Sequence, residues 1–468
     1  MRKFGEMQQI LGRFGRDRGG NFAVLFGMVA SVLALSAGFA INVGQSYQTK
    51  SSLRNALDAA VTSTARDLTT GTIDPKDVRK MVEAFLNANS DQASGAGARF
   101  VLETLNVDPI AKTIEASAST RVDLAFPLFS TGNPRVSIGS AAVYSDTKIE
   151  VAMMLDVTGS MAKRGKVDKI DDLRKAATNA VTLLLGNQDP ENPRVRVAIV
   201  PYAEAVNTGK LADTVFVEVE GGSNLPPAMD APIAVSAERL DNCATERKDK
   251  DGRADFSDDG PYSERKNNKG KTYLAKVNRD DRVEVCPRAE LVPLTADAAR
   301  LIETIDDFRA DGVTAGGIAA QWGYYMLSPK WRSAIDDAGL GAGPADHDPK
   351  KVAKVAILMT DGQFNTAFAG VADNKTPQMR QGSKSRGYAE SLCANMRADG
   401  IEVFTIGFDL NNPGMSRTEK DQAKSVLKNC STPDTSSMKH YFEVATGAEL
   451  DAAFKEIIRN TERLALTK

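Results

Sequence analysis

The longest uninterrupted apolar stretch of the chain lies close to its N-terminus. No charged residue occurs between Arg18 and Lys50, and residues 22–43 are apolar except for two serines and one asparagine. As a helix rising about 1.5 Å per residue, this stretch would extend about 33 Å, which matches a bilayer core of roughly 30 Å. The pattern therefore predicts a transmembrane helix over 21–44. A cleaved signal peptide is the alternative, because a small-x-small site occurs at Gly38-Phe39-Ala40.

The residues before this stretch indicate its orientation. Residues 1–18 contain five positive and two negative side chains: Arg2, Lys3, Glu6, Arg13, Arg16, Asp17 and Arg18. Positive residues tend to stay in the cytoplasm, so we expect residues 1–20 to be cytoplasmic and the remaining chain to lie outside it. No second apolar stretch approaches membrane length, which predicts a single-pass anchor with a large soluble body.

A helical pattern continues beyond the apolar stretch and then changes to a strand-like pattern. Apolar residues recur every three or four positions up to Leu68, and Gly71 with Pro75 ends this helix. We expect a helical stalk over 45–95 and a small β-rich region over 96–147. In more detail, the pattern predicts a second helix over 75–88, a linker over 87–98, and strands over 99–107, 114–126 and 136–144.

From Lys148 onward, buried strands alternate with amphipathic helices. This alternation predicts an α/β fold with a doubly wound, Rossmann-like sheet over 148–462. The predicted strands are 149–155, 195–200, 355–359, 401–406 and 441–444, and the predicted helices are 170–184, 301–308, 318–327, 388–397 and one opened by the capping box Thr446–Glu449.

Residues 207–293 interrupt this alternation with a run of mixed charge. Low hydrophobicity predicts a solvated insertion on the surface, and the spacing of its acidic residues does not fit an EF-hand loop. Cys243 and Cys286 bracket the insertion, and the chain has two further cysteines. Oxidation is expected outside the cytoplasm, so we favour the pairs Cys243–Cys286 and Cys393–Cys430 among the three pairings that four cysteines allow. A reduced core thiol is the alternative for Cys393, which falls on an apolar helix face.

The most informative motif is Asp156-Val157-Thr158-Gly159-Ser160, which follows the first strand of the α/β region. Ligands bind at this edge of open α/β sheets, and the motif offers one carboxylate and two hydroxyls. Thr314 before a helix and Asp361 after another strand add two more oxygen donors. Such donors suit Mg²⁺ or another hard divalent cation such as Mn²⁺. Capping of a helix N-terminus is the alternative for the first motif alone.

Two parts of the chain resemble known families. Residues 148–460 resemble a von Willebrand factor A (vWA) domain, whose metal-ion-dependent adhesion site is Asp-x-Ser-x-Ser with a distant Thr and Asp. Asp156, Thr158, Ser160, Thr314 and Asp361 match these places, with Thr158 in place of the first Ser.

The N-terminus is similar to TadE/TadG-like segments of the bacterial tight-adherence (Flp, type IVb) pilus system. The similarity lies in Arg18-Gly-Gly-Asn-Phe-Ala-Val-Leu-Phe26 and Leu57-Asp-Ala-Ala60; with the Gln321–Trp331 stretch, the combination resembles TadG-like proteins. Pilin-like relatives carry a Glu shortly after their processed Gly, whereas this chain has Leu25, so we expect an anchor that is not cleaved.

Together these features indicate a membrane-anchored binding protein rather than an enzyme. The resemblance implies an inner-membrane protein with a periplasmic body, which binds pilus-assembly components through a partner's Asp or Glu carboxylate on the bound metal. A general cell-surface adhesin is an alternative, and a hydrolase a more remote one, since neither histidine, His347 nor His440, lies in a nucleophile motif. With 59 basic and 61 acidic residues, we expect no nucleic-acid partner, and no motif suggests a small-molecule substrate.

Overall fold

A computed structural model divides the chain into two compact units. The N-terminal unit comprises Met1–Thr69 and Ile73–Tyr144, and the C-terminal unit comprises Thr70–Thr72 and Ser145–Lys468. The described residues are 20–467 apart from 70–71, 94–98, 110, 127–133, 146, 187, 189–191, 217–241, 268–269, 271 and 379. All but the last of the predicted cytoplasmic residues, 1–20, therefore lie outside the described part.

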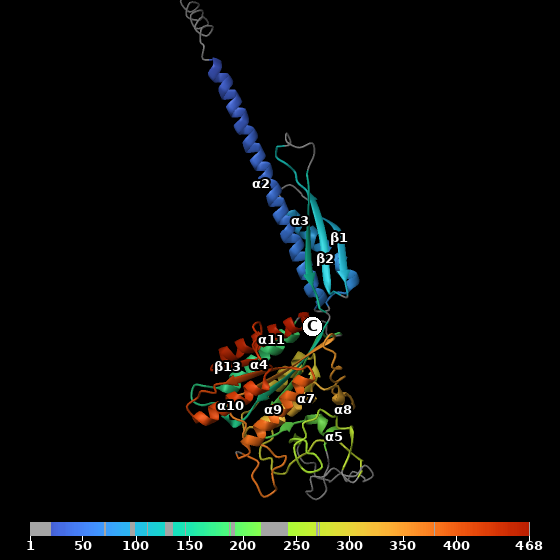
Figure 1. Ribbon diagram of the computed structural model, residues 1–468, viewed down its shortest axis with the longest axis vertical. Coiled ribbons are helices and arrows are strands. Elements are labelled where there is room, and N and C mark those ends of the chain that lie inside the picture. The colour runs from blue at the N-terminus through green and yellow to red at the C-terminus, as the bar shows by residue number, and fades with distance from the viewer. Residues whose placement is uncertain are drawn as a thin grey trace, which may run out of the picture. The chain divides into compact units, whose positions relative to one another are not determined.

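The N-terminal unit is built on one long helix, α2 (Gly20–Thr69, 50 residues). Its first half exposes apolar side chains from Val24 to Val43, and among the described helices α2 is the one long and apolar enough to cross a membrane. Its second half buries Leu53, Leu57 and Val61 in an apolar core. The core is completed by α3 (Val78–Ala93) and the antiparallel strands β1 (Val101–Asp108), β2 (Thr113–Arg121) and β3 (Arg135–Val143) (Figure 1).

Two boundaries in this unit differ from the sequence prediction. Helix α3 follows a 3₁₀ turn at Pro75–Asp77 and continues through Ala93, so the predicted linker begins too early. Ser90, within the additional turn, is buried, and its hydroxyl donates to the Asn87 carbonyl. Strand β2 ends at Arg121 rather than at residue 126. The backbone of Phe126 instead bonds the side chain of Asn42 in α2, which removes it from the β2–β3 ladder.

The C-terminal unit contains a mixed six-stranded sheet, which confirms the predicted α/β architecture. Five strands are parallel, and the edge strand β10 is antiparallel to its neighbour β5. Numbered by their chain order among the six strands of this sheet, the strands lie in the order 3-2-1-4-5-6. They are β10 (Val292–Thr295), β5 (Val195–Tyr202), β4 (Lys148–Asp156), β11 (Val352–Thr360), β12 (Glu402–Phe408) and β13 (Tyr441–Val444).

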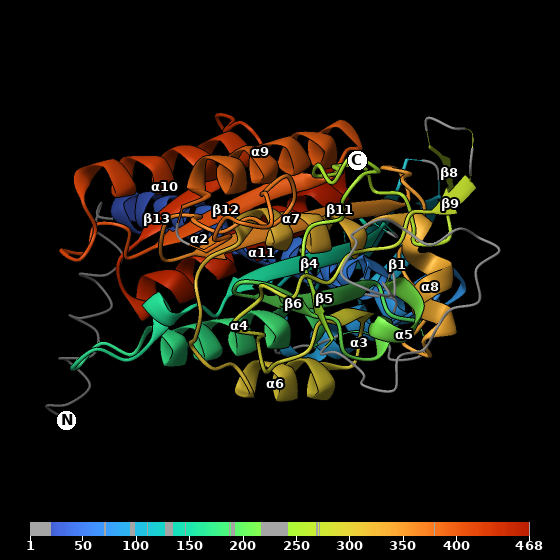
Figure 2. The same cartoon turned by 90° about the horizontal axis from the view of Figure 1, so that it is seen from below.

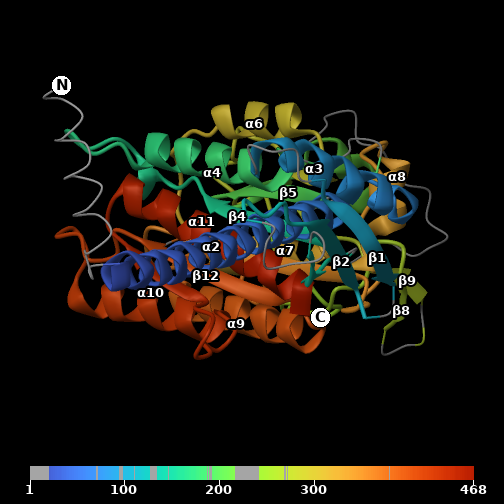
Figure 3. The same cartoon turned by 90° about the horizontal axis from the view of Figure 1, so that it is seen from above.

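Helices cover both faces of this sheet (Figures 2 and 3). Successive side chains of β4 point to opposite faces: Val151, Met153 and Leu155 enter one apolar cluster, and Ala152 and Met154 the other. The first cluster includes α4 (Lys169–Leu185), α6 (Ala298–Asp306) and α11 (Gly447–Thr467). The second includes α5 (Ala212–Val215), α7 (Gly316–Tyr325), α8 (Arg332–Asp337), α9 (Gly382–Ala398) and α10 (Arg417–Cys430).

Residues 207–293 were expected to form a solvated charged loop, and burial of charged residues contradicts this within the described part, residues 207–216, 242–267, 270 and 272–293. Arg247 is 1% exposed, and its guanidinium donates to Asp255 Oδ2 at 2.9 Å and to the Ser257 carbonyl at 2.7 Å. Lys248 and Asp280 form a second buried ion pair at 2.9 Å. Mixed charge permits burial here because each buried cation has a carboxylate or carbonyl partner. The predicted end of the insertion also falls inside β10, whose four residues include Pro293 and gave no strand signal.

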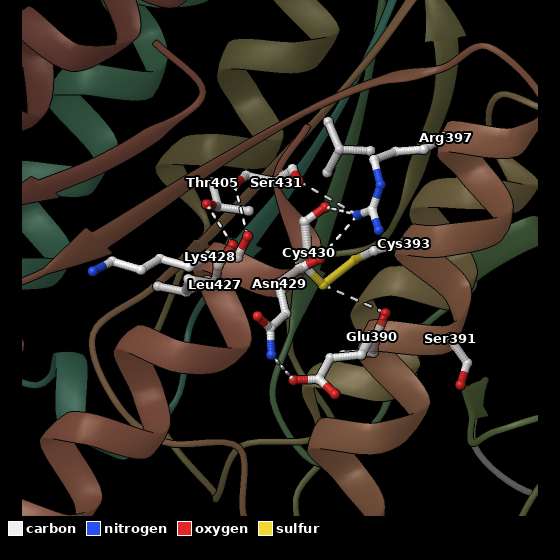
Figure 4. Close-up of a disulfide and its surroundings, with 12 residues drawn as sticks. Glu390, Ser391, Cys393, Arg397, Thr405, Leu427, Lys428, Asn429, Cys430 and Ser431 are labelled. Atoms are coloured by element: carbon white, nitrogen blue, oxygen red, sulfur yellow. Dashed lines mark hydrogen bonds between the residues drawn. A yellow bond between two sulfur atoms is a disulfide. The ribbon is translucent and has the colours of Figure 1, made fainter. Parts of the chain in front are cut away.

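Disulfides join Cys243 to Cys286 and Cys393 to Cys430, the pairs favoured from the sequence. The second links α9 to the end of α10, where further polar contacts surround it (Figure 4). Arg397 of α9 donates to the Asn429 carbonyl at 3.0 Å, and the Asn429 amide donates to Glu390 Oε1 at 2.9 Å. This cluster fixes the two helices that cover β12.

Removing the α9–α10 disulfide should destabilise the C-terminal unit. The bridge closes a sequence separation of 37 residues, for which loop-closure entropy predicts a loss of about 4 kcal/mol in Cys393→Ala/Cys430→Ala. Guanidinium unfolding of the detergent-solubilised chain measures this loss through the fluorescence of Trp322 and Trp331, both fully buried. Ser391→Ala on the same helix is the control and should unfold close to wild type. An unchanged midpoint in the double variant would contradict the prediction.

Candidate metal centre

The five predicted ligand residues lie at the carboxyl-end edge of the central strands. Asp156 is the last residue of β4, and Asp361 follows the last residue of β11. These strands are parallel neighbours with Leu155 opposite Met359, so the two carboxylates are brought to the same place from positions 205 residues apart in sequence. Ser160, Thr314 and Asp361 line a cavity of about 180 Å³ at this edge.

Short loops hold the hydroxyl residues beside these carboxylates. Thr158 precedes a 3₁₀ turn, Gly159–Met161, but its side chain makes no capping bond, so helix capping does not explain the motif. Gly159 N donates to the Gly312 carbonyl at 2.9 Å, which clips the first loop to the loop that contains Thr314. The backbone N–H of Thr314 in turn donates to Asn365 Oδ1 at 2.9 Å.

Two hydrogen bonds to carboxylates and one close contact between hydroxyl oxygens connect four of the five side chains. Asp156 Oδ1 accepts from the N–H of Thr158 at 2.9 Å and from its hydroxyl at 2.6 Å, and Asp156 Oδ2 accepts from the Thr360 hydroxyl at 2.6 Å. The Ser160 hydroxyl donates to Asp361 Oδ1. Both hydroxyl protons are thus committed to carboxylates, yet Thr158 Oγ1 and Ser160 Oγ lie only 3.0 Å apart. Two oxygens with lone pairs at this separation are suited to a shared cation.

The carboxylates of Asp156 and Asp361 are buried, and their ionised forms are destabilised without a counter-ion. Burial raises the pKa of Asp156 to about 6, and the nearby charge of Asp361 adds to this rise. Burial also raises the pKa of Asp361, against the opposing attraction of Lys169. Two ionised carboxylates in a dry site repel each other, and a divalent cation between them would remove this penalty.

Lys169 and Asp409 complete the charge balance, and the sequence analysis missed both. Lys169 Nζ lies 2.9 Å from Asp361 Oδ2 and 3.0 Å from Asp409 Oδ2. Burial acts to lower the pKa of Lys169, but attraction by Asp361 and Asp409 outweighs it and raises the pKa. The cluster of Asp156, Asp361, Asp409 and Lys169 therefore carries a net charge of −2 when ionised, equal and opposite to that of a divalent cation.

The donor set fits a hard divalent cation. It consists of carboxylate and hydroxyl oxygens, and no histidine or cysteine lines the cavity formed by the described residues. In an octahedral Mg²⁺ shell with bonds of about 2.1 Å, neighbouring ligand oxygens lie about 3 Å apart. The Thr158–Ser160 oxygen separation of 3.0 Å matches this spacing.

A second group of metal-compatible side chains, Asp258, His347 and Asp399, is already largely satisfied. Its donor atoms lie within 4.8 Å of one another. However, Asp258 accepts from Lys330 Nζ and from the Ser328 hydroxyl, each at 2.6 Å, and Asp399 accepts from the Tyr324 hydroxyl. A neighbouring ammonium disfavours a cation there, so His347 remains a loop residue beside an internal polar network.

The N-terminal segment matches a known family. Residues 20–67, nearly the whole of α2, match the model of the family described as Flp pilus-assembly TadE/G-like. We refer to residues 20–67, which match this model, as the TadE/G-like segment. The match confirms the resemblance predicted for the N-terminus, and the TadE/G-like segment includes both the exposed apolar half of α2 and its packed half. No curated protein matches the chain.

Several solved structures show a weak likeness that extends beyond the TadE/G-like segment. The vWF domain of the type V pili tip protein Mfa5 from Porphyromonas gingivalis is 12% identical with a TM-score of 0.35, covering 69% of this chain and 97% of that one. The pilus adhesin SpaC from Lactobacillus rhamnosus GG has 12% identity and a TM-score of 0.35, covering 78% of this chain and 34% of that one. The adhesive tip pilin GBS104 from Group B Streptococcus agalactiae has 11% identity and a TM-score of 0.33, covering 68% of this chain and 100% of that one. At these TM-scores the likeness carries no argument, so the function of the C-terminal unit is inferred from its strand order and site geometry.

The raised pKa of Asp156 predicts that the metal-free protein loses folding stability as pH rises. Because the folded-state pKa lies above the ordinary value of 3.8, ionisation of Asp156 destabilises the fold as pH rises from about 4 to 6. In EDTA, Asp156→Asn should therefore gain stability relative to wild type by roughly 2–3 kcal/mol between pH 4 and 7. Thermal melts across this range measure the difference.

Added Mg²⁺ should reduce or reverse the greater stability of Asp156→Asn over wild type, because the cation favours the ionised carboxylate of wild type. Asp421→Asn removes an exposed carboxylate on α10 and controls for the loss of one negative charge outside the site. A difference between Asp156→Asn and wild type that is constant across the pH range would contradict the predicted burial penalty.

Proposed function

We propose that the C-terminal unit is a vWA domain whose metal-ion-dependent adhesion site holds Mg²⁺ and binds a protein partner. In this proposal the chain serves the assembly or anchoring of a tight-adherence (Flp) pilus. The observation that carries the binding proposal is the convergence of oxygen donors on three loops around a buried cluster with a net charge of −2. No bond is made or broken in the partner, so the protein acts as a binding protein rather than an enzyme.

The strand order supports the vWA assignment. Within the C-terminal unit the order is 3-2-1-4-5-6, with strand 3 antiparallel. Chain reversal between strands 1 and 4 makes the edge beyond β4 and β11 the switch point, which is where open α/β sheets bind ligands. Asp156 and Asp361 follow these two strands, so the proposed ligands occupy the position that the topology favours.

The residues of the chain have separable tasks in this proposal. A bound divalent cation would supply a positive centre for a carboxylate of a partner. Asp156, Thr158, Ser160, Thr314 and Asp361 would hold it. Lys169 bonds Asp361 and offsets part of its negative charge, and Asp409 in turn bonds Lys169.

The cavity wall supports an acidic partner side chain as the occupant. Arg164, Asn365 and Asn412 line the cavity together with Ser160 and Thr314. A guanidinium and two amides offer hydrogen-bond donors to the second oxygen of an incoming Asp or Glu carboxylate. The cavity is too small for a large organic ligand, which favours one side chain of a protein.

The TadE/G-like segment supports the pilus context and the membrane anchor. The exposed apolar half of α2 has the length and composition of a single membrane span. The excess of Arg and Lys before it supports a cytoplasmic N-terminus and a periplasmic body at the inner membrane of a bacterium. The alternative function is a general surface adhesin, in which the same site would bind a host or matrix ligand. The identity of the partner distinguishes the two functions.

Metal binding should depend on the hydroxyl of residue 158. Thr158→Ser keeps the hydroxyl and should bind Mn²⁺ within about threefold of wild type. Thr158→Val keeps the shape but loses the oxygen, and we expect at least a tenfold weaker affinity, measured by electron paramagnetic resonance of free Mn²⁺. Thermal melts in EDTA verify that both variants fold. Equal Mn²⁺ affinity in the two variants would remove Thr158 from the ligand set.

Partner capture should require both the metal and an extracytoplasmic body. A membrane-impermeant crosslinker added to spheroplasts of the native organism should link wild type to pilus-assembly proteins. The yield should fall to background in Asp361→Asn or in EDTA and return with Mg²⁺. Asp421→Asn is the matched control and should crosslink like wild type. Linkage only to host or matrix ligands would favour the adhesin, and capture that survives both treatments would refute the metal bridge.

A further inference from the structure

Asn42 is a buried polar residue inside the exposed apolar half of α2. It is 5% exposed, although the apolar side chains around it, including Ile41 and Val43, are about half exposed. Both ends of its amide bond the same residue: Nδ2 donates to the Phe126 carbonyl at 2.7 Å, and Oδ1 accepts from the Phe126 N–H at 3.1 Å. One turn further, Gln45 Oε1 accepts from the Ala125 N–H at 2.9 Å. The chain that leaves β2 is therefore fastened to α2 beyond the edge of the three-stranded sheet (Figure 1).

The attachment point coincides with the end of the apolar surface of α2. Exposed large apolar residues run from Val24 to Val43, and Tyr47, 76% exposed, follows one turn later. Lys50 is the first charged residue after this run. Tyrosine concentrates at membrane–water interfaces, so residues 42–47 mark the outer boundary of the proposed span. Phe126 lies at this level because its backbone bonds Asn42.

The attached segment has the properties of a membrane-interface element. Its sequence, Leu124-Ala125-Phe126, begins an eleven-residue run without charge between Asp123 and Arg135. The Phe126 side chain is 39% exposed. Irregular backbone is tolerated near hydrocarbon where its N–H and C=O groups are satisfied, and Asn42 satisfies both groups of Phe126.

We propose that the segment 124–126 is a second membrane contact, with the Phe126 ring in the outer interfacial layer of the bilayer that holds α2. The occupant is lipid rather than protein, because the Phe126 backbone is bonded to Asn42, which lies within the apolar helix surface that lipid would cover. The inference rests on the proposed membrane anchor. Two contacts, unlike a lone helix, restrict rotation and tilt of the N-terminal unit on the membrane.

Tryptophan quenching by brominated lipid tests the contact in the full-length chain. The chain is reconstituted into phosphatidylcholine–phosphatidylglycerol vesicles whose acyl chains carry bromine at shallow or deep positions. Phe126→Trp should add emission that is quenched at least twofold more by shallow than by deep bromine. Leu33→Trp, in the middle of the proposed span, should be quenched most by deep bromine. Val143→Trp, at the opposite end of the sheet and 59% exposed, should not be quenched. The emission of wild type, from the buried Trp322 and Trp331, is subtracted from each variant.

The controls separate failure of the contact from failure of the anchor. Quenching of Leu33→Trp without quenching of Phe126→Trp would overturn the second contact and leave the anchor standing. Absence of quenching in both would overturn the anchor as well. Asn42→Leu in the Phe126→Trp background removes the two bonds to residue 126 and should at least halve the quenching by shallow bromine. Undiminished quenching in that variant would overturn the role assigned to Asn42.

Discussion

The parallel pairing of β4 with β11 is the constraint on which the rest of the C-terminal unit depends. It places two carboxylates at the same end of the sheet, where both side chains are almost fully buried. Neighbouring side chains stabilise the negative charge of both carboxylates: Thr158 and Thr360 donate to Asp156, and Ser160 and Lys169 donate to Asp361. The site is thus an electrostatic consequence of strand register as much as of its motif.

The parts of the fold that follow local periodicity could be predicted from the sequence. The strand from residue 149 to 155 is a short apolar run that is buried on both faces, and the helix over 170–184 buries one regular apolar face, so the pattern predicts both within a few residues. The edge strand β10 could not be predicted in the same way. Its four residues include a proline, and its place in the sheet comes from pairing with β5.

The same limit applies to the candidate site. Asp156, Thr158 and Ser160 are close in sequence, and their spacing reveals them. The role of Thr360 could have been predicted from the sequence, since this residue directly precedes Asp361 at the end of a predicted strand. Lys169 had none, because a lysine at the start of an amphipathic helix is ordinarily solvated, and its two acidic partners lie 192 and 240 residues away in sequence. The prediction that the charged insertion is solvated was wrong for the same reason. Composition shows how many charged residues it contains, whereas their burial depends on which of them form ion pairs.

The position of β4 has a mechanical consequence. The chain passes from the N-terminal unit into the C-terminal unit at residues 144–145, enters β4 at Lys148, and reaches the candidate site at Asp156. In the proposed function, a tensile load between the anchor and a partner bound at that site would run lengthwise through this central strand. Hydrogen bonds to β5 and β11 on either side lie across the direction of pull, so they share the load in shear and must break together. Connectivity therefore places the strand with the most lateral support in the line of force.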